Sequence, residues 1–501
     1  MKPWSALALL CLLLVSCSPK EDFERLDRAE PTRRLATARA TATPTATPAS
    51  GELAWEPCFI DYDCATLDVP LDYSGAVEGT MEVPLVRVPA SDPDERLGVL
   101  LVNPGGPGGS GVDYVAFSAE SWPEEFRRFD IIGFDPRGVS GDTAVDCTDD
   151  LDDFYAADAS PDTPEELAEL QRVHEDLAGA CEERSGRYLP FLGGDVVIQD
   201  IDRIREALGE EQISFLGLSY GTYLGARYAD RYPQRVRAFV LDGATDPQLP
   251  GSEWQKQQAI GFEIALDAFL ADCAARPECA FHSGGDPGAA FDELMARIEA
   301  QPLRAGRRPI SATDAESAVL GSLYNKDYGW PSLELALAAA GSGDGSDLLQ
   351  IADSFVDRNR DGSYDNFAER YRAITCRDLS FPVNLAGFEA MARELKAAAP
   401  RFGATLAWEH LDCMYWPVKA GQPAAVRAAG AAPILVVGTS RDPATPLVWA
   451  ESLAEQLESG VLLVLDGDGH VAFTESDCID DAIVRYLVEL KPPAPRTVCQ
   501  G

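Results

Sequence analysis

A short segment around Ser219 has the residue types and the spacing of an activated nucleophile. Residues 217–221 read Gly-Leu-Ser-Tyr-Gly, which matches the pattern G-x-S-x-G. The apolar run Ile213–Leu218 before the serine predicts a strand, and Tyr220–Tyr232 after it has helical spacing. A serine at such a corner is exposed at the carboxyl edge of a sheet, and the flanking glycines relieve backbone crowding. The alternative is a serine that only caps a helix N-terminus.

A serine hydroxyl needs a neighbouring base, and the chain contains four histidines. We predict that His470 is the base, because it follows the predicted strand Val461–Leu465 and precedes the last predicted helix. Asp442 follows the preceding predicted strand and is the predicted orienting acid. Asp466 and Asp468 are alternatives by composition. They lie on the same loop as His470, too close in sequence to approach its ring from the far side.

Negative charge that develops on a substrate oxygen needs backbone N–H donors, and two segments can supply them. The N–H of Tyr220 directly follows the predicted nucleophile. The glycine-rich segment Asn103–Gly111 follows an early predicted strand, and its glycines let the backbone approach a substrate closely. A phosphate-binding loop is the rival interpretation, but the segment lacks the lysine of G-x-x-x-x-G-K-[ST].

A sheet must position these residues, and the hydrophobic pattern predicts one. Strands alternate with helices, which predicts an α/β fold with a mostly parallel sheet and helices on both faces. Residues 251–430 are rich in Ala, Glu and Leu at helical spacing, so we predict that they form a helical cap inserted into a core of residues 53–250 and 431–501. The predicted strands are Leu97–Asn103, Phe129–Asp135, Ile213–Leu218, Val236–Asp242, Pro433–Gly438 and Val461–Leu465; the predicted core helices are Val197–Leu208, Tyr220–Tyr232 and Asp480–Leu490.

The N-terminus predicts export. Residues 1–17 combine a basic start with an apolar run, Trp4–Val15, that is too short to span a bilayer. Residues 14–17 read Leu-Val-Ser-Cys, which resembles the lipobox of bacterial lipoproteins, whose cysteine is acylated. We therefore expect a lipid on Cys17 and an anchor at the outer face of a bacterial cell membrane; an ordinary signal peptide is the alternative. Residues 18–52, rich in Ala, Thr and Pro, are predicted to form an extended tether.

Cysteine usage agrees with an oxidising compartment. Of the 12 cysteines, Cys11 belongs to the predicted signal peptide and Cys17 to the lipid site, which leaves an even number. The remaining cysteines fall into neighbouring couples, which predicts disulfides, although connectivity does not follow from sequence alone. The predicted pairs are Cys58–Cys64, Cys147–Cys181, Cys273–Cys279, Cys376–Cys413 and Cys478–Cys499.

The charge of the chain limits its partners. A formal net charge of -40 repels phosphate backbones, so we expect no nucleic-acid binding. It would attract cationic substrates such as peptide N-termini, although adaptation for solubility or to salt is the simpler explanation of such a charge.

One segment resembles the start of a calcium-binding loop. Residues 357–365 read Asp-Arg-Asn-Arg-Asp-Gly-Ser-Tyr-Asp, but position 12 of that loop is Ala368 instead of the required glutamate, and Glu369 comes one residue late. We therefore predict a capped turn here, and neither a metal nor another cofactor for the protein.

Taken together, these motifs resemble the tripeptidyl-aminopeptidase branch of the α/β-hydrolases, close to the proline iminopeptidases. The resemblance rests on Gly-Gly-Pro-Gly at 105–108, Asp-Pro-Arg-Gly at 135–138, the serine segment, Thr-Cys-Arg-Asp at 375–378, Cys-Met-Tyr-Trp-Pro at 413–417 and Arg-Asp-Pro-Ala-Thr-Pro at 441–446. It implies that Gly106 supplies the second oxyanion donor. Proline iminopeptidases have a histidine where Pro104 stands, which argues against a strict iminopeptidase.

The resemblance implies a serine exopeptidase that removes short peptides, tripeptides among them, or single residues from the N-termini of oligopeptides. Such an enzyme must bind the terminal ammonium, and carboxylates just past Val236–Asp242 are the expected ligands: Glu253, which stands beside Trp254, then Asp246 and Glu263. A carboxylesterase or lipase-like hydrolase would share the same catalytic residues and is the alternative enzyme. A non-catalytic binding lipoprotein would not need all three of them.

Overall fold

The computed structural model describes residues 53–59, 61–306 and 308–501, and within them ten strands form one sheet. Their order is β1-β2-β3-β5-β4-β6-β7-β10-β11-β12; β1, β2 and β3 are antiparallel to their neighbours, and the strands from β5 to β12 run parallel. The strands are β1 (Glu56–Cys58), β2 (Tyr62–Pro70), β3 (Thr80–Val88), β4 (Val99–Asn103), β5 (Asp130–Phe134), β6 (Ile213–Leu218), β7 (Val236–Asp242), β10 (Ile434–Arg441), β11 (Gly460–Asp468) and β12 (Thr497–Gln500).

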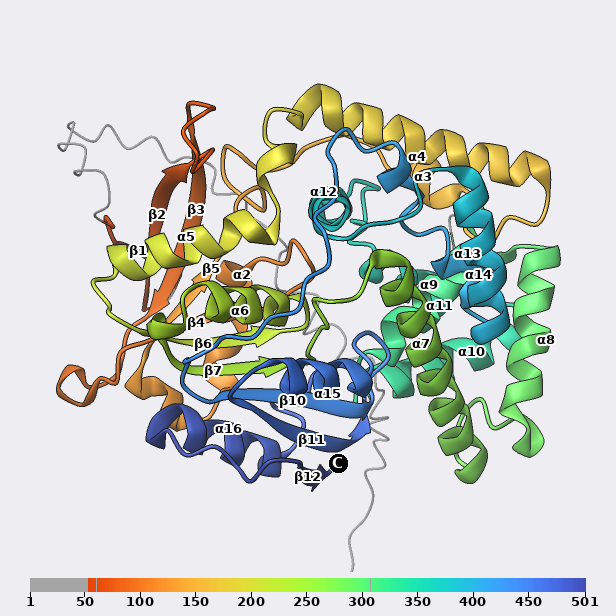
Figure 1. Cartoon of the computed structure of the whole chain (residues 1–501). Helices are drawn as coiled ribbons and strands as arrows, with labels where there is room; N and C mark the ends of the chain where they lie inside the picture. Colours follow the sequence, from red (N-terminus) through yellow and green to blue (C-terminus); the bar gives the residue numbers. More distant parts are fainter. Residues whose placement is uncertain (1–52, 60, 307) are drawn as a thin grey trace, which may run out of the picture. The chain divides into compact units, whose positions relative to one another are not determined.

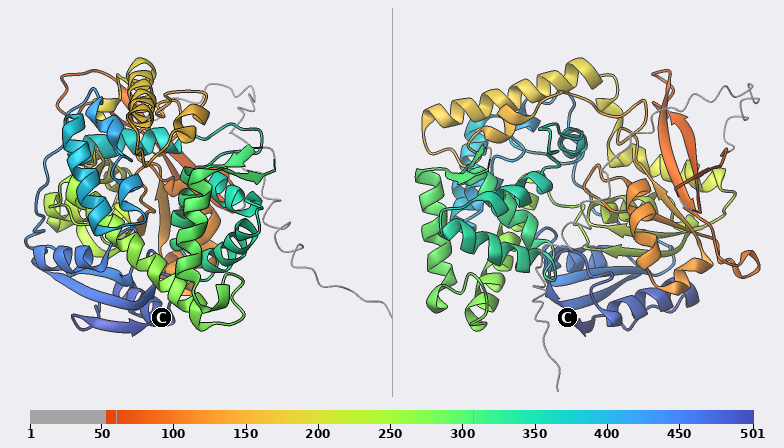
Figure 2. Two further views of the ribbon diagram at one scale, coloured as in Figure 1. Left: turned by 90° about the vertical axis from the view of Figure 1, so that its right-hand side faces the viewer. Right: turned by 180° about the vertical axis from the view of Figure 1, so that it is seen from behind.

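Helices cover both faces of this sheet (Figure 1). On one face pack α5 (Gly194–Ala207), α6 (Tyr220–Arg231) and α15 (Leu447–Gln456). On the other face pack α2 (Gly111–Ser118) and α16 (Asp477–Glu489), which face the viewer in the right-hand view of Figure 2. The central strands are apolar on both sides because both sides are covered, and β4 and β6 are buried along their whole length.

Between β7 and β10 the chain leaves the sheet and forms a helical layer with its own apolar core. Its helices are α7 (Gly251–Ala275), α8 (Pro287–Ala300), α9 (Ala312–Leu323), α10 (Gly329–Gly341), α11 (Ser346–Phe355), α12 (Phe367–Asp378), α13 (Leu385–Ala398) and α14 (Gly403–Leu406). A two-stranded sheet, β8 (Leu303–Ala305) with β9 (Arg308–Ile310), interrupts them. The sequence pattern did not reveal this small sheet, because each strand has three residues.

A segment between β5 and β6 also contributes to this layer. The two helices α3 (Asp152–Ala156) and α4 (Pro164–Ser185) lie there, and Figure 1 shows α4 extending across the top of the molecule toward the other cap helices. Leu170 and Val173 of α4 pack into the cap core, whereas Leu177 and Cys181 pack into the sheet core. The cap core therefore contains residues from outside the predicted cap 251–430. These residues belong to the segment 53–250, which was predicted to form part of the α/β core.

The structure contains the five disulfides expected from the neighbouring cysteines: Cys58–Cys64, Cys147–Cys181, Cys273–Cys279, Cys376–Cys413 and Cys478–Cys499. No helix in the described part of the chain is both long enough and apolar enough to cross a bilayer. The predicted signal peptide, Cys17 and the tether lie outside the described residues.

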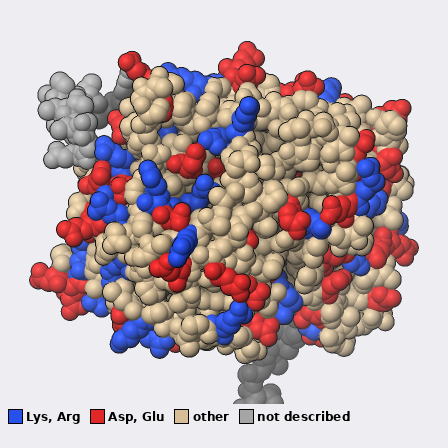
Figure 3. All heavy atoms as spheres, in the orientation of Figure 1, with Lys and Arg blue, Asp and Glu red and all other residues tan. Residues whose placement is uncertain are grey.

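The acidic composition does not produce one uniform patch on the face shown in Figure 3. Acidic and basic side chains are interspersed there. Many arginines are paired with carboxylates; Arg401, for example, lies 2.8 Å from Glu263 and 3.0 Å from Asp267.

Candidate active site

Ser219 occupies a strained corner between β6 and α6. Its φ is 54° and its ψ is -126°, a region that non-glycine residues rarely adopt. The corner is tight: a Cβ added to Gly221 would stand 2.4 Å from the carbonyl oxygen of Asn103. This close approach explains the second glycine of G-x-S-x-G, and the turn presents Ser219 at the carboxyl edge of the sheet.

The glycine-rich loop after β4 lies against this corner. A Cβ on Gly105 would be 2.8 Å from the Tyr220 nitrogen and 2.9 Å from Ser219 Cβ. The N–H of Gly105 donates to Asn103 Oδ1 at 3.1 Å, whereas the hydrogen bonds among the described residues use neither the Gly106 nor the Tyr220 N–H. Both predicted oxyanion donors are therefore free for a substrate oxygen.

His470 and Asp442 form a hydrogen-bonded pair. His470 Nδ1 lies 2.9 Å from each carboxylate oxygen of Asp442. The carboxylate is buried and accepts the N–H groups of Ala444 at 2.9 Å and Thr445 at 2.8 Å, and the Thr445 hydroxyl at 2.9 Å. These bonds orient the acid, and the acid fixes the imidazole so that Nε2 is free for proton transfer.

Ser219 Oγ makes no hydrogen bond to His470 among the described residues. Such bonds are often long in enzymes without substrate and tighten in the complex. The two residues are nevertheless tied to one element: the Ser219 N–H donates to the carbonyl of Asp242 at 2.9 Å, and a Cβ on Gly243 would be 3.1 Å from His470 Cε1.

The alternative acids on the His470 loop have other partners. Asp468 pairs with Arg441 and lies 2.7 Å from Lys326 Nζ. Asp466 accepts the Ser440 hydroxyl at 3.0 Å. These contacts tie the Asp442 loop to the His470 loop, and they leave the orienting role to Asp442.

His470 is also in contact with the cap, through Tyr324. The His470 N–H donates to the carbonyl of Tyr324 at 2.8 Å, and the two rings meet edge to face with centroids 5.3 Å apart. His174 and His410 are both buried in the cap region, and burial lowers the pKa of each. His174 bonds to Asp412 at 3.2 Å.

Three motif residues whose roles were not predicted from the sequence have defined partners in the fold. Asp378 accepts the Tyr220 hydroxyl and the Gly194 N–H, and burial raises its pKa to about 6. Asp135 accepts the Ser110 hydroxyl at 2.7 Å, where the glycine loop enters α2. Arg137 forms a fully buried ion pair with Asp200. The sequence motifs marked these three residues, but only the fold shows what each side chain contacts.

Each of the three carboxylates predicted to bind the substrate amine already has a protein partner. Glu253 accepts Gln257 Nε2 at 2.8 Å and lies 3.9 Å from Lys256. Asp246 is buried and accepts Gln456 Nε2 at 2.8 Å. Glu263 forms the ion pair with Arg401 described above, 2.8 Å in length.

A fourth carboxylate near the site, Glu409, was not predicted from the sequence. Its two oxygens accept Gln255 Nε2 at 2.7 Å and the Tyr371 hydroxyl at 3.4 Å. Its side chain is 29% exposed and lies 3.9 Å from His410 Nε2, and in the described part of the chain no lysine or arginine pairs with it. Burial and the charge of Glu409 raise the pKa of Tyr371, and burial, Glu409 and Asp442 raise that of Tyr324. No sequence motif marks this residue.

The segment that resembles a calcium loop forms hydrogen-bonded turns. Asp361 accepts the Ser363 N–H at 3.0 Å, and Glu369 is turned inward to accept the Cys147 N–H at 3.1 Å. Among the described residues, the groups spaced like metal ligands each contain a disulfide, Cys273–Cys279 or Cys376–Cys413, whose sulfurs are not thiolates.

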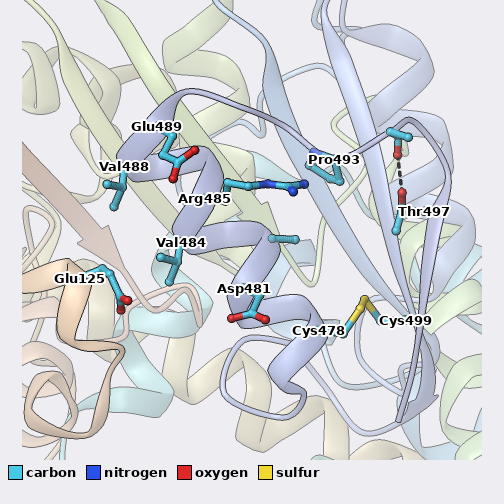
Figure 4. Close-up of a pocket in the computed structure, with 12 residues that line it drawn as sticks. Glu125, Cys478, Asp481, Val484, Arg485, Val488, Glu489, Pro493, Thr497 and Cys499 are labelled. Carbon is cyan, nitrogen blue, oxygen red and sulfur yellow. Dashed lines mark hydrogen bonds between the residues drawn. A yellow bond between two sulfur atoms is a disulfide. The ribbon is translucent and has the colours of Figure 1, made fainter.

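A pocket of about 640 Å³ lies away from these residues, beside α16 and β12. Figure 4 shows the Cys478–Cys499 disulfide at one end of this pocket and Arg485 projecting across it. None of Ser219, Asp442 and His470 lines it, so its size alone does not make it the catalytic site.

Comparison with known proteins agrees with the fold. Residues 98–283 match the family described as alpha/beta hydrolase fold, and residues 399–499 match the family described as TAP-like protein. The chain is 34% identical over 529 residues to serine protease Hip1 of Mycobacterium tuberculosis, covering 99% of this chain and 97% of that protein. It is 35% identical to carboxylesterase B of the same organism (87% and 86% covered) and 29% identical to a tripeptidyl aminopeptidase of Streptomyces lividans (92% and 89% covered).

The fold and the site are those of a serine hydrolase with the α/β-hydrolase fold. Within that superfamily, the chain belongs to the tripeptidyl-aminopeptidase-like branch, and its relatives there include proteins named serine protease and tripeptidyl aminopeptidase.

Proposed function

We propose that this protein is an exported serine exopeptidase that removes short peptides, tripeptides among them, or single residues from peptide N-termini. Ser219 attacks the scissile carbonyl while His470 takes its proton, and Asp442 stabilises the imidazolium that forms. The N–H groups of Gly106 and Tyr220 bind the oxyanion. His470 then protonates the leaving amine, and water releases the N-terminal fragment from the acyl-enzyme by the same steps.

The observation that carries the exopeptidase proposal is the position of Glu409. Tyr371, its hydrogen-bond partner, lies over the oxyanion loop: a Cβ on Gly108 would be 3.3 Å from the Tyr371 nitrogen. Tyr324, whose pKa Glu409 raises, packs on the ring of His470. A partly exposed carboxylate that pairs with no lysine or arginine among the described residues, is hydrogen-bonded to Tyr371 and is electrostatically coupled to Tyr324 suits the terminal ammonium of a substrate.

The test compares peptide p-nitroanilides with free and acetylated N-termini. Wild type should cleave the free peptides and reject the acetylated ones, whereas Glu409→Gln should lose at least roughly tenfold in kcat/KM on free peptides only, because a charged hydrogen bond is lost. Glu253→Gln is the matched control, with the same change at a partly exposed position of the cap helix α7. If wild type accepts both substrates equally, the exopeptidase proposal is wrong; if Glu253→Gln shows the loss instead, the ammonium ligand is Glu253.

A carboxylesterase is the second candidate, because a relative of 35% identity carries that name. Short-chain p-nitrophenyl esters assayed beside peptide p-nitroanilides distinguish the two, since an esterase turns over the esters without cleaving the peptide amides, whereas a peptidase cleaves the amides. Ser219→Ala should lower both activities by at least about three orders of magnitude, because triad residues act as a unit.

We also propose that the protein is lipid-anchored through Cys17 at the outer face of a bacterial membrane. The five disulfides support an oxidising compartment. Metabolic labelling with a radioactive fatty acid should label wild type in a bacterial host and leave Cys17→Ser unlabelled. Equal labelling of both proteins would contradict the anchor.

A further inference from the structure

A second buried carboxylate lies behind the catalytic residues. Asp242 is the last residue of β7, and its side chain is fully buried. Its carboxylate accepts the N–H of Ala472 at 3.0 and 3.1 Å and the N–H of Phe473 at 2.7 Å, just past His470. Its backbone carbonyl accepts the Ser219 N–H at 2.9 Å.

One residue thus holds both parts of the reaction centre. The backbone of Asp242 holds Ser219, whose φ of 54° is strained, and its side chain holds the loop that carries His470. That loop is strained as well, because Val471 has a φ of 74°. Strained backbone conformations persist only where surrounding bonds enforce them. The bonds to Asp242 therefore hold Ser219 and the loop after His470 in their strained conformations.

The bonds require a group that only accepts hydrogen bonds. The side chain of Asp242 faces two backbone N–H groups, and no lysine or arginine in the described part of the chain pairs with it. An ionised carboxylate offers two acceptor oxygens, whereas an asparagine would direct an NH₂ group at one of the N–H donors. Burial raises the pKa of Asp242 to about 6, and the two N–H groups oppose that rise.

We propose that Asp242 is a positioning residue that sets the place of His470 relative to Ser219, separately from the orienting acid Asp442. This inference rests on the proposed Ser-His-Asp mechanism. Asp442 controls the direction of the imidazole ring, whereas Asp242 controls where the loop holds that ring above the serine. Loss of Asp242 therefore slows the attack of Ser219 and leaves substrate binding unchanged.

The same loop offers a matched control. Asp480, in the first turn of α16, accepts the Thr474 N–H at 2.9 Å, one residue beyond Phe473. Asp480 has no bond to the Ser219 backbone among the described residues. Asp480→Asn removes the same kind of loop contact without touching the link between Ser219 and His470.

The experiment measures steady-state kinetics on a free tripeptide p-nitroanilide, together with the rate at which a small fluorophosphonate labels Ser219. In the labelling reaction Ser219 Oγ bonds to phosphorus, fluoride leaves and His470 accepts the serine proton, so the rate reports the serine–histidine pair without any peptide subsite. Asp242→Asn and Asp242→Ser are compared with wild type and with Asp480→Asn, and each rate is normalised to folded protein isolated by gel filtration.

We expect Asp242→Asn to lower kcat about 10- to 100-fold, the size of effect that a displacement of about 1 Å produces. The labelling rate should fall in parallel, KM should stay within about twofold, and Asp480→Asn should remain within about twofold of wild type in every rate. If Asp242→Asn does not fold, Asp242→Ser should show the same loss of kcat and labelling rate with the same unchanged KM. Unchanged labelling in a folded variant, an equal loss in Asp480→Asn, or failure of both Asp242 variants to fold would each overturn the proposal. Failure of wild type to label at Ser219 would instead reject the proposed serine mechanism.

Discussion

At the residue scale, Thr445 is the neighbour on which the orientation of Asp442 depends. Its hydroxyl donates to Asp442 at 2.9 Å and lies 3.2 Å from His470 Nδ1. Thr439, on the adjoining strand β10, is also buried, but its hydroxyl has no partner among the described residues. The two threonines therefore differ in hydrogen bonding more than in burial.

We predict that Thr445→Val lowers kcat by roughly tenfold, because one charged hydrogen bond to Asp442 is lost and the acid gains freedom to rotate. Thr439→Val, the control, should keep wild-type kcat and match or exceed wild-type stability, since it removes an unpaired buried hydroxyl. Steady-state kinetics and urea unfolding measure both effects. An equal loss of kcat in the two variants would show that Thr445 contributes only packing.

A second prediction at this scale concerns stability and pH. Burial, with a smaller contribution from Asp442, raises the pKa of Asp242 from 3.8 to about 6, although His470 and the N–H groups of Ala472 and Phe473 oppose the rise. The unfolded chain ionises this group more readily, so the folded state loses stability as pH rises from about 4 to about 6. The loss is about 3 kcal/mol for a shift of this size.

The measurement compares the free energy of unfolding of wild type and Asp242→Asn at pH 4 and pH 7. The difference, wild type minus variant, should be larger at pH 4. A difference that stays constant, or that grows toward pH 7, would show that Asp242 remains ionised in both states. Tyr114 also faces Asp242, but burial raises the pKa of Tyr114, so it stays neutral in this range.

At the scale of elements, the C-terminal strand β12 depends on a covalent link. The disulfide Cys478–Cys499 joins it to α16, and the two cysteines are 21 positions apart in the sequence (Figure 4). Replacing both cysteines by serine should cost about 3 kcal/mol, as expected for a loop of this length, measured by urea unfolding. The activity of the folded protein should fall as well, because β12 pairs with β11, the strand that leads to His470.

The Cys58–Cys64 disulfide provides the control for that experiment. It closes a hairpin between β1 and β2, at the opposite edge of the sheet from β12. Its removal should lower stability while leaving kcat of the folded protein unchanged. If both double variants lose activity equally, the effect reports general destabilisation.

At the scale of the whole molecule, the net charge of -40 should influence how cationic substrates arrive. A peptide with several arginines is attracted at low ionic strength, and added salt screens the attraction. We predict that kcat/KM for such a peptide falls between about 20 and 500 mM NaCl, whereas that for a peptide without charged side chains changes much less. Equal salt effects on the two peptides would assign the acidic composition to solubility alone.

The sequence by itself determined the parallel centre of the sheet and the principal catalytic candidates. The strands Ile213–Leu218 and Val236–Asp242 begin and end where the apolar runs predict, because strands buried on both faces are continuously apolar. Ser219 could be identified from the sequence because the tight turn between β6 and α6 requires glycines at fixed positions. The cysteine couples were informative because each disulfide joins cysteines that neighbour one another in the order of the sequence, 6 to 37 positions apart.

Only the tertiary structure decided which side chains meet across the sheet and the cap. The antiparallel strands β1, β2 and β3 were not predicted, because strands that are partly exposed alternate in polarity and lack a continuous apolar signal. Glu409 and Asp242 stand in no motif, and their importance comes from contacts with Tyr371 and with the loop after His470, far along the chain. A carboxylate's role depends on its burial and on the donors that surround it, and the folded chain alone sets both.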